Sequence, residues 1–260
     1  MSYLNANHSA EPKESLVDHA EALDADSIVV RFEGLVAIDH VSLSFSRREL
    51  FGLIGPNGAG KTTLVNVLTG FQPPAAGRVS INGVEVTGWQ PHLLARNGVA
   101  RTFQSGRLFR DYTVRENLEA GAIGVGLSRR EARSRAIEVL DWLDLENNAD
   151  VLADTVPYGI ERRVGIARAL ATHPRWLLLD EPAAGLNDQE CEELMSTVSR
   201  IPGAFGCGVL IIEHNMRVIM SVCERIHVID FGKTIAEGTP KEVQANPDVI
   251  AAYLGKHRQG

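Results

Sequence analysis

The 260-residue chain has little cysteine, no long apolar run and no excess of basic charge. Its three cysteines, Cys191, Cys207 and Cys223, are odd in number and widely spaced, which predicts buried or idle thiols rather than a disulfide framework or a zinc site. Its longest apolar runs, such as Trp176–Leu179, are far too short to span a bilayer. The formal net charge of −7 argues against a general nucleic-acid binder, because binding to a phosphate backbone needs a basic face.

A targeting signal is also lacking at the N-terminus, where no basic segment precedes an apolar one. Residues 1–26 are polar and acidic without periodicity, which predicts a flexible tail before a folded domain over residues 27–260. With 44% hydrophobic and 23% charged residues, a chain of this length can bury a substantial core. We therefore expect a cytosolic protein that needs a partner for any role at a membrane.

A glycine-rich stretch is the most informative feature that is present. It runs Gly55, Pro56, Asn57, Gly58, Ala59, Gly60, Lys61 and Thr62, which fits the pattern G-x-x-x-x-G-K-[ST] at every defined position. The apolar segment Leu50–Ile54 precedes it and residues 63–68 continue in helical register, so we expect a buried strand, a tight loop and a helix N-terminus. Backbone N–H groups of such a loop, together with the helix N-terminus, bind phosphate. An ordinary glycine-rich turn is the alternative, which these flanks disfavour.

Several side chains suit a nucleotide and a metal ion. Lys61 is expected to reach the β- and γ-phosphates, and the Thr62 hydroxyl to bind Mg²⁺. The apolar run Leu177–Leu179 leads into Asp180 and Glu181, as in buried parallel strands that carry functional groups at their C-terminal ends. Asp180 is expected to orient Mg²⁺, and Glu181 to polarise an attacking water as a general base. Solvated strand ends are the alternative, which the nearby phosphate loop disfavours.

The rest of the chain divides into an α/β part and a helical part. Strand-like segments at 28–32, 41–45 and 78–86 predict a small, partly antiparallel sheet around the loop. Residues 105–160 have a helical texture, with a capping-box sequence at 113–116, and predict an inserted helical subdomain. Two short helices are expected over about 239–255, because Thr-Pro-Lys-Glu and Asn-Pro-Asp are helix starts.

Five elements in order resemble those of the ATP-binding subunits of ABC transporters. They are the phosphate loop, Phe103-Gln104, Tyr158-Gly159, the run Leu-Leu-Leu-Asp-Glu-Pro and Ile212-Glu213-His214. Their order and spacing cover residues 27–237. The resemblance implies an α/β fold in which a P-loop NTPase (RecA-like) core carries an antiparallel β-subdomain and an inserted helical subdomain.

The resemblance also implies roles for individual residues. The stretch from Gly55 through Thr63 matches the Walker A loop, Asp180 the Walker B acid and Glu181 the catalytic glutamate. Gln104 matches the glutamine that senses Mg²⁺ and the attacking water and links the site to the membrane subunit. His214 matches the switch histidine that contacts the γ-phosphate, although a lone histidine after a strand is more often structural.

Phe32 matches the aromatic residue that stacks on adenine, for which any ring face suffices. A phenylalanine in a strand is more often part of the core, so this assignment has a plain structural alternative.

The signature element departs from the usual family sequence Leu-Ser-Gly-Gly-Gln. Here it reads Val156, Pro157, Tyr158, Gly159 and Ile160. In this family two subunits sandwich two ATP molecules, so Tyr158 and Gly159 are expected to face the partner's nucleotide. Pro157 offers neither a hydroxyl nor a backbone N–H to a phosphate, whereas a helix start at Ile160 would keep the helix-terminus contribution. Whether the variant weakens one composite site is left open.

The following D-loop also varies, because Ala184-Gly185-Leu186-Asn187 stands where the family usually has Ser-Ala-Leu-Asp. An asparagine at its last position can still form hydrogen bonds across a dimer but carries no charge.

Longer strings at 101–110, 182–187 and 246–255 resemble the branched-chain amino acid importers of this family. The resemblance implies an ATPase subunit that energises uptake of branched-chain, hydrophobic amino acids, with urea or short amides as alternative cargo. It implies ATP and Mg²⁺ as cofactors. The expected partners are a second ATPase subunit, homologous or identical, two integral membrane permeases and, indirectly, a substrate-binding protein, without nucleic acid. The expected location is the cytoplasmic face of the membrane.

Two other classes of protein are alternatives to a transporter subunit. A soluble ABC-type ATPase of translation or DNA repair is disfavoured, because this chain has one cassette and its insertion lacks sustained heptads. A silent nucleotide site is disfavoured by the intact set of Lys61, Thr62, Asp180, Glu181 and His214.

Overall fold

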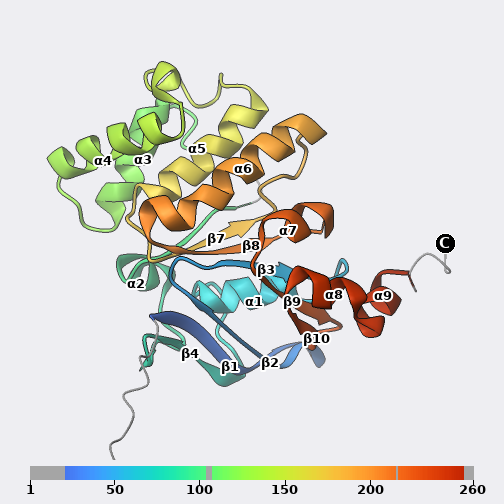
Figure 1. Cartoon of the computed structure of the whole chain (residues 1–260). Coiled ribbons are helices and arrows are strands. Elements are labelled where there is room, and N and C mark those ends of the chain that lie inside the picture. The colour runs from blue at the N-terminus through green and yellow to red at the C-terminus, as the bar shows by residue number, and fades with distance from the viewer. Residues whose placement is uncertain (1–20, 104–106, 215, 255–260) are drawn as a thin grey trace, which may run out of the picture.

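The computed structural model describes residues 21–103, 107–214 and 216–254, and it has two sheets with helices on both sides of the larger one (Figure 1). The larger sheet has six strands in the order β10-β9-β3-β8-β7-β6. All of its neighbours pair in parallel except β10, which is antiparallel to β9. Its strands are β3 (Leu50–Ile54), β6 (Val99–Arg101), β7 (Trp176–Asp180), β8 (Gly208–Ile212), β9 (Arg225–Asp230) and β10 (Lys233–Gly238).

The three central strands β3, β7 and β8 are buried along their whole length, which is why their sequences are continuous apolar runs. Parallel strands bring their C-terminal ends to one edge of the sheet, where functional groups gather. The α/β prediction is therefore confirmed, and the residues that follow β3 and end β7 meet at that edge.

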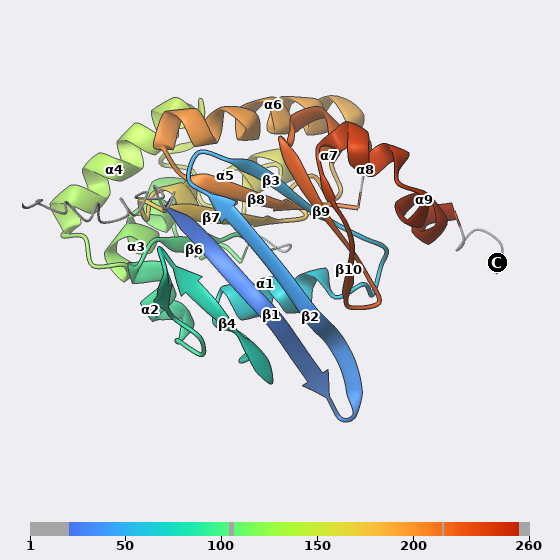
Figure 2. The same cartoon turned by 60° about the horizontal axis from the view of Figure 1, so that its bottom comes forward.

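The smaller sheet is antiparallel and covers helix α1 (Lys61–Leu68), as Figure 2 shows with β1 and β2 in front of the helix. Apolar residues of α1 share one core with those of β1, β2, β3 and β7. The predicted β-subdomain is thus present. Its strands are β1 (Ala22–Phe32), β2 (Leu35–Ser46), β4 (Ala76–Ile81) and β5 (Val84–Glu85).

The boundary of the predicted tail was wrong, because β1 begins at Ala22 and not after residue 26. Leu23 and Ala25 are buried at alternate positions and pair with both β2 and β4. The acidic residues Asp24 and Asp26, which interleave with them, made this segment resemble a polar tail. Residues 1–20, the greater part of that tail, lie outside the described residues.

The predicted helical insertion lies above the larger sheet in Figure 1. The capping box predicted at Thr113 is confirmed, because its side chain accepts a hydrogen bond from the Glu116 backbone N–H and the Glu116 carboxylate accepts one from Thr113. Helix α5 begins at Tyr158 rather than at Ile160, with Pro157 as its N-cap. The elements of this part are α3 (Val114–Gly124), α4 (Arg129–Trp142), a 3₁₀ turn (Glu146–Asn148) and α5 (Tyr158–Leu170).

The remaining helices cover the sheet and follow it at the C-terminus. Both predicted C-terminal helices are present, and Thr239 forms the expected capping box with Glu242. Within the described ranges, none of the helices combines the length and apolar character needed to cross a membrane. These helices are α2 (Pro91–Arg96), α6 (Asp188–Phe205), α7 (Met216–Val222), α8 (Pro240–Ala245) and α9 (Pro247–Leu254).

Candidate active site

The glycine-rich loop joins β3 to α1, as predicted, and its close contacts need glycine at positions 55 and 60. A Cβ atom added to Gly55 would lie 2.0 Å from the backbone oxygen of Ile229. One added to Gly60, which has φ +106°, would lie 2.6 Å from Ile38 Cδ1. The Gly232 N–H also donates to the Ala59 oxygen at 2.9 Å, which ties the loop to the β9–β10 turn. The loop is therefore held as a tight cradle at the N-terminus of α1.

A cavity of about 550 Å³ lies over this cradle. Lys61 is buried, and its Nζ donates to the backbone oxygens of Gly55 at 2.7 Å and Pro56 at 3.0 Å. A loop with N–H groups, a lysine and a helix N-terminus fits the phosphates of a nucleotide. The cavity is lined by Leu35, Val36, Ala37, Asn57, Gly58, Ala59, Gly60, Lys61, Thr62, Thr63, Glu181 and Phe231.

Asp180 lies beside a second cavity of about 510 Å³, which Thr62 also lines. A hydroxyl and a carboxylate are oxygen ligands of the kind that Mg²⁺ prefers, so this donor set fits the ion. The Asp180 carboxylate also accepts a hydrogen bond from Arg101 Nη2 at 2.7 Å, and both side chains are nearly buried. Arg101 Nη1 donates to Asn66 Oδ1 at 2.6 Å, so the guanidinium is held on two sides.

Glu181 has a positive φ of 47°, and its N–H donates to the Ile212 oxygen at 2.9 Å. Its Oε1 lies 3.9 Å from His214 Nδ1. The neighbouring Glu213 is buried, its Oε1 accepts a hydrogen bond from the Ala183 N–H, and burial raises the pKa of its carboxyl. The ends of β7 and β8 thus bring the predicted general base and the switch histidine together beside the loop cavity.

Some predicted site residues lie elsewhere. Phe32 is 44% exposed at the end of β1 and is not among the described residues that line the loop cavity, so its adenine role stays a prediction. Gln104 lies outside the described residues. Tyr158 and Gly159 start α5, and neither is among the described residues lining the loop cavity. The aromatic residue that does line it is Phe231, which is 77% exposed.

Asn66, Arg101 and Phe231 lie at this site and were not among its predicted residues. A usable signal existed for Arg101 and Phe231, since each ends or directly follows a strand of the same parallel sheet. The contacts of Arg101 with Asn66 and Asp180 join positions that are far apart in the chain, so no local sequence pattern predicts them.

A phosphate cradle after a buried strand, with an acid at the end of a neighbouring parallel strand, defines a P-loop nucleotide-binding protein. The family model described as ABC transporter matches residues 38–184, and the model described as branched-chain amino acid ATP-binding cassette transporter matches residues 233–258. The chain therefore belongs to the ATP-binding cassette family of ABC transporter ATPases.

Individual relatives agree with this assignment. The chain is 41% identical over 249 residues to the high-affinity branched-chain amino acid transport ATP-binding protein BraF of Pseudomonas aeruginosa, which covers 90% of this chain and 98% of that protein. It is 42% identical over 249 residues to LivG of Salmonella typhimurium, with the same coverage. It is 35% identical over 235 residues to the lipopolysaccharide export ATP-binding protein LptB of Escherichia coli, covering 90% of this chain and 97% of that protein.

Solved structures confirm the predicted fold. The ADP conformation of MJ1267, an ATP-binding cassette of an ABC transporter, matches with a TM-score of 0.82 and 32% identity, over 90% of this chain and 99% of that one. The dimeric structure of the bacterial cassette MJ0796 matches with a TM-score of 0.75 and 26% identity, over 84% of this chain and 98% of that one.

Proposed function

We propose that this chain binds and hydrolyses ATP, with Mg²⁺, to energise the import of branched-chain, hydrophobic amino acids. The observation that carries the proposal is the single cavity that Lys61, Thr62 and Glu181 line together. The cargo is supported by BraF and LivG, which are branched-chain amino acid transport proteins, and by the family model matched at residues 233–258.

Binding would exchange contacts within the loop for contacts to phosphate. The Lys61 ammonium would exchange its hydrogen bonds to the backbone oxygens of Gly55 and Pro56 for hydrogen bonds to the β- and γ-phosphates. The backbone N–H groups of the loop would bind oxygens of the same phosphates. Thr62 and Asp180 would hold Mg²⁺, which neutralises phosphate charge when bound. Glu181 would then polarise the attacking water, and His214 would contact the γ-phosphate.

A second cassette would complete each site. The start of α5, where the signature lies, belongs to a cavity of about 610 Å³ that contains Pro157, Gly159 and Ile160 and none of the described residues of the phosphate loop. A signature that lies apart from its own loop can serve the loop of a partner. The dimeric MJ0796 cassette supports such an arrangement.

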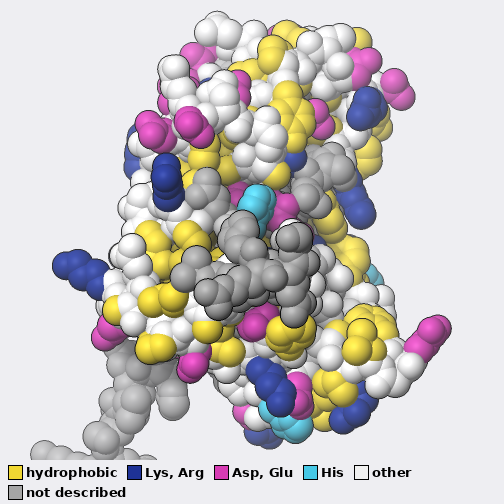
Figure 3. Space-filling view, turned by 90° about the vertical axis from the view of Figure 1, so that its right-hand side faces the viewer, with side chains coloured by type: hydrophobic (Ala, Val, Ile, Leu, Met, Phe, Trp, Pro, Cys, Tyr) yellow, Lys and Arg dark blue, Asp and Glu magenta, His cyan; other side chains and the backbone are white. Residues whose placement is uncertain are grey.

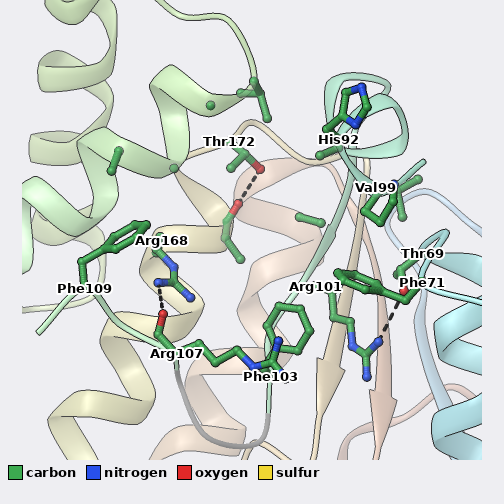
Figure 4. Close-up of a pocket in the computed structure, with 18 residues that line it drawn as sticks. Thr69, Phe71, His92, Val99, Arg101, Phe103, Arg107, Phe109, Arg168 and Thr172 are labelled. Carbon is green, nitrogen blue, oxygen red and sulfur yellow. Dashed lines mark hydrogen bonds between the residues drawn. The ribbon is translucent and has the colours of Figure 1, made fainter. Parts of the chain in front are cut away.

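A membrane subunit would contact the groove shown in Figure 4. This cavity of about 460 Å³ lies between α2 and β6 on one side and α3 and α5 on the other. Phe71, Phe103 and Phe109 supply apolar surface, while Arg107 and Arg168 supply charge, and none of the described lining residues is acidic. An apolar helix with an acidic residue fits this lining, and such a partner would hold the chain at the cytoplasmic face of the membrane.

The groove is braced internally. Arg168 Nη1 donates to the Arg107 oxygen at 2.6 Å, and the Arg107 guanidinium lies 4.3 Å from the centroid of the Phe103 ring.

The absence of a nucleic-acid partner stays a prediction, which rests on the formal net charge of −7. On the face shown in Figure 3, Lys and Arg side chains are scattered among Asp and Glu side chains and do not gather into a basic stripe.

The test uses the complex purified with its native membrane and binding subunits. Glu181→Gln should keep ATP binding and lose nearly all turnover, because the loop is intact while the general base is absent. ATPase stimulation by leucine, isoleucine and valine, compared with urea and acetamide, should favour the amino acids. Normal turnover in Glu181→Gln would contradict the role of Glu181, and stimulation by urea alone would contradict the cargo.

A further inference from the structure

The first residue of α5 packs against the loop that follows β7. The Tyr158 hydroxyl donates to the Ala184 oxygen at 2.9 Å. Gly185 has φ +81°, and a Cβ atom added to it would lie 3.0 Å from both Cε1 and Oη of Tyr158. The Tyr158 ring therefore occupies the space that a side chain at position 185 would need.

Arg162, one turn further along α5, completes this contact. Its Nη2 donates to the Ala184 oxygen at 3.2 Å and also to the Tyr158 hydroxyl. Its guanidinium lies 4.8 Å from the centroid of the Tyr158 ring. The Tyr158 hydroxyl thus donates to one group of its own chain and accepts from another, and it is not free to serve as a phosphate ligand in this arrangement.

Both positions depart from the usual family sequences. Position 158 falls on a glycine of Leu-Ser-Gly-Gly-Gln and holds tyrosine here, whereas position 185 falls on the alanine of Ser-Ala-Leu-Asp and holds glycine here. A side chain at 185 would meet the Tyr158 ring, so the glycine there leaves the space that the tyrosine fills.

The contact continues to the general base. The Ala184 N–H donates to the backbone oxygen of Glu181 at 3.2 Å, and the Ala183 N–H donates to the carboxyl oxygen Oε1 of Glu213 at 2.9 Å. The segment between Glu181 and Gly185 is thus held by α5 at one end, and by a backbone turn from Glu181 and the buried Glu213 carboxyl at the other.

We propose that Tyr158 and Gly185 form a mechanical link through which the signature helix of this chain positions the chain's own Glu181. The signature faces another nucleotide only in the sandwich dimer, so the link rests on the proposed function. In that dimer, a shift of α5 caused by the partner's ATP would move the Ala184 carbonyl and hence the Glu181 backbone. Tyr158 is then a positioning residue, not a phosphate ligand.

The test is a double-mutant cycle in the intact transport complex, with Tyr158→Gly, Gly185→Ala and the double variant. Each single variant should lower kcat at least tenfold and leave the KM for ATP within twofold, because the phosphate loop is untouched. The double variant should lose less kcat than the product of the two single fold-losses predicts, because the ring that a side chain at 185 would meet is absent. Tyr158→Phe, which keeps the ring and loses the hydroxyl, should lower kcat about two- to tenfold, as expected for one hydrogen bond.

Gly203→Ala in α6 is the matched control, since no atom lies within 4 Å of the added Cβ, and its kcat should not change. Strictly multiplicative effects on kcat, or effects confined to KM, would overturn the link. Thermal unfolding of every variant shows whether it still folds. If Tyr158→Gly or Gly185→Ala does not fold, the kcat of Tyr158→Phe tests the link instead, and an unchanged kcat would contradict it. If the unmodified complex shows no ATP hydrolysis, the proposed function has failed; if it hydrolyses ATP and the cycle shows no coupling, only the link has failed.

Discussion

Replacing Arg101 by methionine would leave Asp180 without its cation. The two side chains are only 6% and 10% exposed, and Nη2 lies 2.7 Å from Oδ2. Methionine keeps much of the apolar stem and removes the guanidinium, which also contacts Asn66 and lies 5.0 Å from the centroid of the Phe103 ring. The substitution therefore tests the buried charge more than the volume of the side chain.

Breaking a buried pair by removing one partner costs about 3–5 kcal/mol, because the other charge stays buried and uncompensated. For a chain of this size each kcal/mol lowers Tm by about 2–4 °C, so Tm should fall by roughly 6–20 °C. Arg101→Met combined with Asp180→Asn removes both charges, and it should be closer in stability to the unmodified chain than Arg101→Met is.

Urea unfolding, followed by circular dichroism, of the unmodified chain, of Arg101→Met, of Asp180→Asn and of the double variant measures this cycle. Arg78→Met is the control, because Arg78 pairs with Asp26 at 3.1 Å with both side chains more than half exposed. Such a surface pair contributes about 0–1 kcal/mol. The reasoning is refuted if Arg101→Met loses no more stability than Arg78→Met.

Three further results are expected. Lys61→Ala should weaken ATP binding about ten- to hundredfold in a fluorescent-nucleotide titration, as loss of charged hydrogen bonds predicts; unchanged affinity would contradict the phosphate role. Gly203→Ala should raise the free energy of unfolding by about 0.5–1 kcal/mol, because alanine favours the helix and its Cβ meets no neighbour. Gly55→Ala should lower the free energy of unfolding by more than that, because its Cβ would clash with the Ile229 backbone oxygen. Urea unfolding measures both, and the opposite order of stabilities would contradict the steric argument. The hydrogen bond to His227 holds the pKa of Glu237 below its ordinary value of 4.5, so its stabilisation is present above pH 4.5 and lost as the pH falls through the lowered pKa. Glu237→Gln should therefore flatten the acid limb of a stability profile, and an unchanged limb would count against that bond.

Local chemistry was predictable from the sequence. The helix starts at Thr113 and Thr239, the phosphate loop and the buried strand before Asp180 follow from residues within a few positions of one another, and the structure contains each of them. The order of these elements along the chain then carried the family resemblance, and the family is confirmed by the model matched at residues 38–184 and by the identity to BraF.

Contacts between distant positions were not predictable. Arg101 and Asp180 are 79 positions apart, and Tyr158 and Ala184 are 26 apart, so neither pair leaves a periodic trace in the sequence. The early start of β1 was missed for a different reason. The half-buried Asp24 and the exposed Asp26 alternate there with only two apolar residues, Leu23 and Ala25, which is a weaker signal than the alternation in β2.

Arg101 lines both the groove proposed for a membrane subunit and the cavity beside Asp180. One side chain therefore belongs to two binding surfaces at once. Thermodynamic reciprocity then sets a strict condition: if a helix in the groove changes the affinity for Mg²⁺ by some factor, Mg²⁺ must change the affinity for that helix by the same factor. If a membrane subunit binds this groove, its affinity for the chain would therefore depend on whether Mg²⁺ occupies the nucleotide site.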